Sequence, residues 1–101
     1  MKLSLSSPQF QLVLQQSKSL TVNGLHFRFL PSKKNLIGFA INKKLGQAIQ
    51  RNLFKRRCRA IFVNRLKNRP AFFLIVSPKK PLNQIDNIDE SFQQFEQRVC
   101  A

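Results

Sequence analysis

Residues 72–76, with the sequence FFLIV, restrict the fold more than any other segment of the chain. The run is unbroken, its residue types favour strands, and Pro70 and Pro78 stand on either side of it. A run of this kind predicts a strand that is buried on both faces, in the middle of a sheet. The chain has 101 residues, a length that suits one domain with one core. We therefore expect a single domain over residues 1–101, with this strand near the centre of its sheet.

Two further strands are predicted in the first half of the chain. Residues 25–30 alternate apolar with polar side chains and end at Pro31, which is typical of a half-exposed strand. Residues 37–42 form the second strand, and the short basic turn between the two segments favours a hairpin. We interpret residues 17–24 as a polar connection that ends in the turn pair Asn23-Gly24.

Three helices are predicted around these strands. Ser7 as N-cap and Pro8 as first helical residue signal the start of a short helix over residues 8–16. A long helix is expected over residues 47–64, and a final helix over residues 86–99 with apolar side chains on one face.

The resulting order of elements is α-β-β-α-β-α. Since the long helix joins strands 36–42 and 71–77, these two strands should be parallel. The predicted fold class is α+β, an α/β two-layer single domain with a βαβ crossover.

The charge of the chain is strongly positive and unevenly distributed. Eighteen Lys and Arg face four Asp and Glu, which gives a formal net charge of +14. All four acids lie in residues 86–101, and Arg98 is the one basic residue of that segment. A folded domain with this balance repels itself unless a polyanion neutralises it, and nucleic acid is the commonest such polyanion. We favour nucleic-acid binding over a merely solubilising surface, because ordinary surfaces mix both signs of charge.

The long helix is expected to carry the binding surface. At about 100° per residue, an arc of roughly 140° collects its basic and amide side chains: Arg51, Asn52, Lys55, Arg56 and Arg59. The other side, which we expect to pack on the sheet, collects Ile49, Leu53, Phe54, Cys58, Ala60 and Ile61.

Three of these cations, Arg51, Lys55 and Arg59, recur every four residues, which places them about 6 Å apart along the helix axis. Phosphates along one RNA strand have a similar spacing, and an arginine can hold a phosphate with two hydrogen bonds. Lys43 and Lys44 extend the patch at the helix entrance. Basic amphipathic helices also bind membranes and calmodulin, but those targets prefer an isolated helix, and strands flank this one closely.

Little else in the chain predicts chemistry. Cys58 and Cys100 lack the spacing of a metal site, and the single histidine, His26, lies in a strand, where a solvent-facing role is the better interpretation than catalysis. No signal peptide is visible behind Lys2, and no apolar run approaches the ~20 residues of a membrane helix. We expect a cytoplasmic protein with two reduced thiols, no disulfide, no metal held by the protein and no membrane partner.

The combination KK-x-G-x-A-x-x-RN-x-x-KR-x-x-R resembles the signature of the bacterial ribonuclease P protein component. It matches without gaps, at Lys43, Lys44, Gly46, Ala48, Arg51, Asn52, Lys55, Arg56 and Arg59. The length and the order of elements also fit, so the resemblance covers nearly the whole chain. It implies a ribosomal protein S5 domain 2-like fold, in which the βαβ crossover is left-handed, an exception to the usual rule.

The resemblance also implies a function. The family's protein binds a large catalytic RNA, and the complex removes the 5′ leader of precursor tRNA in a magnesium-dependent endonucleolytic reaction. The RNA and its bound Mg²⁺ perform the hydrolysis, so no catalytic residue is expected in the protein. By resemblance the RNA-binding residues are Lys43, Lys44, Arg51, Asn52, Lys55, Arg56 and Arg59.

A second site implied by the resemblance is a cleft for the leader, bordered by the first helix and the sheet. Phe10 matches an aromatic position there, where a ring could stack on a base, although core packing is an equally good interpretation of Phe10. Phe27, Arg28 and Phe29 are further cleft candidates.

The chain departs from the family pattern at a few positions. Leu53 stands where a basic residue is common, Leu36 and Ile37 stand where Arg and Leu often precede Gly38, Asn42 replaces a frequent Ser, and Ala60 replaces an acid.

Two alternatives to the ribonuclease P subunit are a structural RNA-binding protein, such as a ribosomal protein of related fold, and a self-sufficient protein nuclease. The nuclease would need carboxylates or histidines around metal ions, and here the acids are crowded near the C-terminus.

Overall fold

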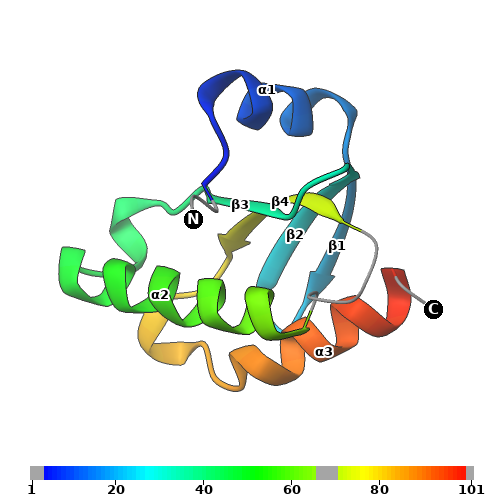
Figure 1. Ribbon diagram of the computed structural model, residues 1–101. Helices are drawn as coiled ribbons and strands as arrows, with labels where there is room; N and C mark the ends of the chain where they lie inside the picture. The colour runs from blue at the N-terminus through cyan, green and yellow to red at the C-terminus, as the bar shows by residue number, and fades with distance from the viewer. Residues whose placement is uncertain (1–3, 66–70, 100–101) are drawn as a thin grey trace.

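A four-stranded sheet separates one helix from two others (Figure 1). The computed structural model describes residues 4–65 and 71–99. The helices are α1 (Ser7–Gln16), α2 (Ala48–Arg65) and α3 (Ile88–Val99), and the strands are β1 (Lys18–Val22), β2 (Leu25–Pro31), β3 (Leu36–Phe39) and β4 (Phe72–Pro78). Short 3₁₀ turns, η1 (Lys43–Leu45) and η2 (Leu82–Gln84), precede α2 and α3. Helix α1 lies over one face of the sheet, and α2 and α3 cover the other.

The strand order is β1-β2-β4-β3, so the apolar run of β4 is central, as predicted. Strand β4 is parallel to β3 and antiparallel to β2, and the parallel pairing expected across α2 is confirmed. The expected hairpin between residues 25–30 and 37–42 is wrong, because β4 lies between these two segments.

The hairpin that forms instead joins β1 to β2. Residues 18–22, interpreted from the sequence as a connection, are a strand whose Leu20 and Val22 alternate with polar side chains. Asn23 and Gly24 both have positive φ, 50° and 82°, which is the backbone that a tight two-residue hairpin turn requires. The observed order of elements is therefore α-β-β-β-α-β-α, one strand more than expected.

Side chains of β4 reach both faces of the sheet, which explains its unbroken apolar sequence. Leu74 and Val76 belong to the core beneath α2 and α3. Ile75 points to the other face, since it is buried and paired with Gly38, whose missing Cβ would meet Phe10 of α1. Aromatic rings dominate the core beneath α3, where Phe27 stacks on Phe95 with ring centroids 4.8 Å apart.

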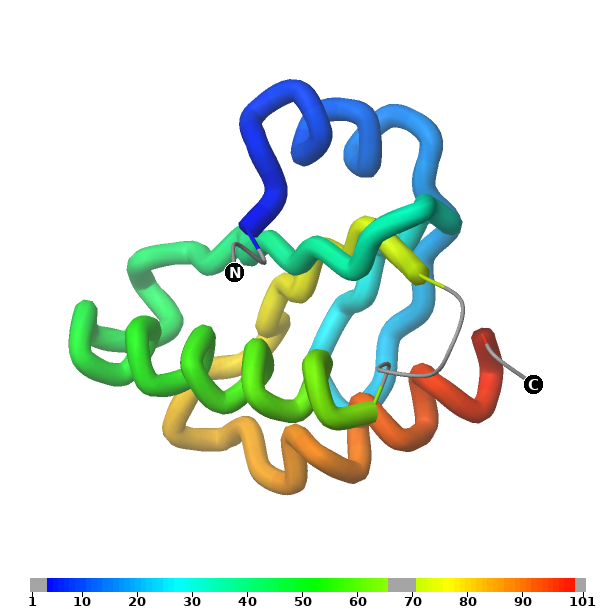
Figure 2. The backbone as a smooth tube through the Cα atoms, viewed as in Figure 1, coloured from blue at the N-terminus to red at the C-terminus, as the bar shows by residue number. Residues whose placement is uncertain are grey.

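Helix α1 is tied to the edge of the sheet through the segment before it. Ser4 forms a parallel bridge with Ile37 of β3, and the Leu5 amide donates to the Ile37 carbonyl at 3.3 Å. The tube in Figure 2 shows the start of the described chain beside β3. The N-cap is Ser6, one residue earlier than predicted: its Oγ accepts from the Gln9 amide, and the Gln9 side chain accepts from the Ser6 amide. The helix therefore begins where the edge pairing ends.

Helix α2 presents a different face to the core than the helical periodicity suggested. The buried side chains are Phe54, Cys58 and Phe62. Ile49 and Leu53, which we expected to pack on the sheet, are 80% and 44% exposed, and Ala60 is also exposed. The 100° spacing gives the relative directions of side chains but does not say which arc faces the sheet. That choice depends on where β3 and β4 place the helix.

Candidate nucleic-acid interface

The entrance to α2 presents two exposed lysines on a short, capped turn. Lys43 and Lys44 lie on η1, and Asn42 caps this turn because its Oδ1 accepts from the Lys44 amide at 2.9 Å. The cap holds the backbone that carries both ammonium groups. A turn fixed in this way presents the lysines together, beside the first turn of α2.

Gly46 allows η2 to lie close to this entrance. A Cβ at Gly46 would be 2.8 Å from Cδ1 of Leu82 and 2.9 Å from Oε1 of Gln50, closer than real Cβ contacts come. The Gln50 oxygen also accepts from the Gln47 amide at 2.8 Å, which satisfies an amide at the start of α2. The glycine of the sequence signature thus has a packing role at the entrance to α2.

Lys43, Lys44 and Arg51 line a shared open hollow of about 460 Å³. Pro81 and Asn83, from the connection between β4 and α3, complete its wall. Sequence reasoning did not include these two residues, because they are distant in the chain and carry no charge. The hollow is therefore polar and cationic, and a phosphate-sized anion can enter it.

Arg51 has a buried group without a partner. The residue is half-buried on the flank of α2, and its Nε lies out of solvent with no hydrogen-bond acceptor. Buried donors in folded proteins are nearly always satisfied. An acceptor that arrives with a ligand, such as a phosphate oxygen, would satisfy this donor.

Arg59 is held by an aromatic ring at the other end of the same stripe. Its guanidinium carbon lies 5.5 Å from the centroid of the Phe39 ring, a distance at which cation and π system attract. Phe39 in turn contacts Phe54 edge-on, with centroids 6.2 Å apart. The core thus fixes the direction of a surface cation.

The five residues predicted on one arc of α2 do lie together. Arg51, Lys55 and Arg59 are half-buried along one flank of the helix, whereas Asn52 and Arg56 are exposed beside them. The half-buried stems lose less rotamer freedom when a ligand is bound. The arrangement forms a continuous cationic surface from η1 to the last turns of α2, which we call the basic stripe: Lys43, Lys44, Arg51, Asn52, Lys55, Arg56 and Arg59.

The four residues proposed for a cleft are divided between the two faces of the sheet. Phe10 lies over Gly38 on the α1 face, where a Cβ at Gly38 would be 3.2 Å from the ring. Alternation along β2 directs Arg28 to this same face. Phe27 is completely buried on the opposite face, and Phe29 packs there against Phe72 and Phe95. Phe10 and Arg28 are therefore the two candidates that a ligand on the α1 face can reach.

His26 lies on the same face as Arg28 and is bonded to a neighbouring strand. Thr21 Oγ1 and His26 Nδ1 are 2.8 Å apart, across the β1–β2 pairing. Burial, helped by the positive charges of Lys79 and Arg28, lowers the pKa of His26 below its ordinary value. The ring is therefore a neutral hydrogen-bonding group at neutral pH, in a positively charged setting.

The described part of the chain contains neither a metal-binding cluster, nor a reactive cysteine, nor a membrane-spanning helix. Residues 4–65 and 71–99 contain no cluster of three or more His, Cys, Asp or Glu that could hold a metal ion. Burial raises the pKa of the Cys58 thiol to about 12, so this free cysteine is a core residue rather than a nucleophile. Cys100 lies outside the described residues. None of the described helices combines the length and apolar character that crossing a bilayer requires.

The family model for ribonuclease P matches residues 3–99. The chain belongs to the ribonuclease P protein family. The ribonuclease P protein component of Helicobacter acinonychis is 37% identical over 54 residues, which are 54% of this chain and 35% of that protein. The component of Nitratiruptor is 30% identical over 73 residues, 70% of this chain and 67% of that protein. These matches thus span between about a third and two thirds of the relatives' own lengths.

A solved ribonuclease P protein shares the fold. The structure of the Staphylococcus aureus protein superposes with a TM-score of 0.81 at 22% identity, over 95% of this chain and 94% of that one. The ribonuclease P fold therefore accommodates the extra strand β1 that the sequence did not reveal. The signature residues from Lys43 to Arg59 occupy η1 and one flank of α2 within that fold.

Proposed function

We propose that this chain is the RNA-binding subunit of ribonuclease P, which binds the catalytic RNA and the 5′ leader of precursor tRNA. The basic stripe is the observation that carries this proposal, together with membership of the family. Its cations lie on a flank of the helix, next to the side that is anchored in the core by Phe54, Cys58 and Phe62. A rigid row of cations, with no acid before residue 86 in the sequence, matches a folded RNA backbone.

The stripe would act mainly through phosphate contacts. The unsatisfied Nε of Arg51 gains an acceptor when a phosphate enters the hollow beside η1. Arg59, positioned by Phe39, contributes a second fixed guanidinium, and Asn52 and Arg56 are free to reach sugars or further phosphates. These contacts bring RNA strands together by screening their mutual repulsion, and they do not move protons or break bonds.

The α1 face is the proposed position of the leader. Phe10 offers a ring edge beside Gly38, and Arg28 and Lys79, which lie near the neutral His26 ring, make that face positive. A single strand fits such a surface because bases stack on aromatic rings while cations follow the backbone. This assignment keeps the leader and the RNA subunit on different parts of the protein.

Hydrolysis is assigned to the RNA and its Mg²⁺ ions. The donor set of the protein supports this division: Asp86, Asp89 and Glu90 surround the start of α3, and Asp89 is paired with Arg65. Mg²⁺ prefers several oxygen ligands in octahedral geometry, and the described acids do not converge on one point. A cytoplasmic location, where precursor tRNA is processed, belongs to the same proposal.

Reconstitution tests the proposal directly. The purified protein is mixed with a bacterial ribonuclease P RNA, and cleavage of precursor tRNA is assayed at low magnesium. Cleavage at the mature 5′ end that needs both components supports the subunit assignment. Tight RNA binding without a gain in cleavage would favour a structural RNA-binding protein. Cleavage by the protein alone would indicate a self-sufficient nuclease.

A further inference from the structure

The side of α2 that faces away from the basic stripe carries an apolar surface that no part of the described chain covers. Ile49 and Leu53 are 80% and 44% exposed on the first half of the helix. Isolated exposed apolar residues are common, but Leu53 lines one of two adjoining hollows that follow the same helix. Leu53 and the two hollows together form one surface, which we call the α2–α3 groove.

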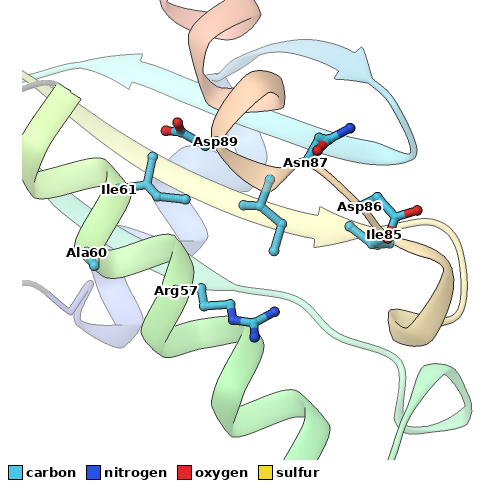
Figure 3. A pocket seen from close by; sticks show the side chains of 8 residues that line it. Arg57, Ala60, Ile61, Ile85, Asp86, Asn87 and Asp89 are labelled. Carbon is cyan, nitrogen blue, oxygen red and sulfur yellow. The ribbon is translucent and has the colours of Figure 1, made fainter.

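The two hollows share a wall and follow α2 toward its C-terminal half. The larger, of about 440 Å³, lies between Ala60 and Ile61 of α2 and the segment from Ile85 to Asp89 (Figure 3). The smaller, of about 170 Å³, extends it past Leu53 toward Leu82. Arg57, Ile85 and Ile88 line both. The floor of the groove is therefore apolar, and the groove runs along α2 from Leu53 to Ile61.

Positively and negatively charged side chains both lie on the rim of the α2–α3 groove. Arg57 reaches over the groove from α2, and Asp86 and Asp89 stand on the opposite side (Figure 3). Arg57 and Asp86 line the same hollow, yet the described residues record no ion pair between them. All the acids of the chain fall in this region or on α3. RNA is disfavoured at such a rim, because phosphates would meet carboxylates before they reach a cation.

We propose that the α2–α3 groove binds a second copy of this chain in a two-fold symmetric dimer. In such a dimer each patch must complement itself. Two antiparallel α2 helices, related by an axis near Arg57, place Leu53 of one copy opposite Ile61 and the larger hollow of the other. The exposed Leu53 on the N-terminal half of α2 in one copy thus fills the larger hollow beside the C-terminal half of α2 in the other copy.

Charge supports the same occupant. Around the two-fold axis each Arg57 meets Asp86 of the other copy, a carboxylate for which the described residues record no ion pair, whereas Asp89 stays paired with Arg65 of its own chain. The overall charge of +14 opposes association of the free protein. Salt, which screens that repulsion, should therefore favour the dimer. The basic stripe lies on another arc of α2, so the inference does not depend on the proposed RNA-binding function.

Sedimentation equilibrium of the full chain, at high salt and over a wide range of concentrations, tests the proposal. The wild-type protein should show a monomer–dimer equilibrium that strengthens as salt is raised. Leu53→Gln should raise the dissociation constant at least about tenfold, because each dimer loses two apolar contacts. The matched control is Leu12→Gln, an equally charge-neutral change at an exposed leucine on α1, across the sheet, and it should leave the constant unchanged.

Exchanging the charges of Arg57 and Asp86 distinguishes a loss of contact between the two copies from a loss of folding. Arg57→Asp and Asp86→Arg should each weaken the dimer, and the double variant should recover it, with circular dichroism showing that all variants remain folded. A protein that stays monomeric at every salt and concentration would overturn the proposal and leave the groove to a different protein partner. Equal effects of Leu53→Gln and Leu12→Gln, or no recovery in the double variant, would overturn it as well.

Discussion

The Nε of Arg65 lies 2.9 Å from Oδ1 of Asp89, and this ion pair joins the last turn of α2 to the first turn of α3. Arg65 also approaches Glu96, with Nη1 3.8 Å from Oε2. One arginine therefore bridges two acids that lie about two turns apart on α3. Since the exposed fraction of the Arg65 side chain is 27%, the guanidinium is partly shielded, which favours fixed geometry over a loose surface contact.

Asp89 should make stability depend on pH. Its hydrogen bond to Arg65 lowers the carboxyl pKa below the ordinary value. A group whose pKa is lower in the folded state stabilises it above the unfolded pKa and loses this effect as pH falls through the folded pKa. We expect Asp89→Asn to be less stable than the wild type in urea unfolding at neutral pH, with the difference shrinking as the pH falls below the ordinary pKa of an aspartate and through the lowered pKa of Asp89.

The matched control for this experiment is Glu90→Gln. Glu90 is an exposed acid next to Asp89, and the structure records no ion pair for it. Its loss should leave the pH dependence of stability close to that of the wild type. A difference between Asp89→Asn and wild type that persists unchanged into acid would show that the amide disturbs packing rather than the ion pair.

The sequence predicted the central strand, the parallel pairing across α2 and the three helices, because each depends on a strong local pattern. The apolar run of β4 and the helical repeat of α3 are signals of that kind. Strand β1 was missed because its polar residues, such as Lys18 and Ser19, lie on an exposed edge and only Leu20 and Val22 face the core. The wrong hairpin has a non-local cause: β4 inserts between β2 and β3 from forty residues away in the sequence.

The candidate site was predictable to a similar degree. The basic stripe follows from helical geometry, and the structure does bring its members together. The hollow beside η1 was not predictable, because Pro81 and Asn83 reach it through tertiary folding. Strand alternation could have separated Arg28 from Phe27 and Phe29, but the sequence does not say which face of β2 lies under α1.

Arg51 and Arg56 should each contribute to RNA affinity through phosphate contacts. Replacement of either by Ala should weaken binding to the ribonuclease P RNA by roughly 1–3 kcal/mol and reduce the slope of log affinity against log salt by about one. Filter binding over a range of salt concentrations measures both quantities. Arg98→Ala, which removes a charge from the exposed end of α3, is the control. Salt slopes unchanged in both α2 variants would exclude the basic stripe as the RNA surface.

Phe39 should affect RNA binding without touching RNA. Phe39→Leu keeps an apolar side chain but removes the ring beneath Arg59, and it should weaken RNA affinity by about 0.5–1 kcal/mol. In an Arg59→Ala background the same change should have no further effect on affinity, because the cation is already lost. Additive losses in this double-mutant cycle would contradict the positioning role of the ring.

Phe10 should distinguish substrates that carry a leader from those that lack one. Phe10→Ala removes the ring that lies over Gly38 on the α1 face, and stacking of a base on such a ring is worth about 1–3 kcal/mol. The reconstituted complex should therefore bind precursor tRNA more weakly, while its affinity for mature tRNA stays unchanged. Leu12→Ala, an exposed apolar change on the same helix, serves as control and should affect neither substrate. Equal losses for precursor and mature tRNA would instead assign Phe10 to packing between α1 and β3, and thermal unfolding of the free variant would then show a matching loss of stability.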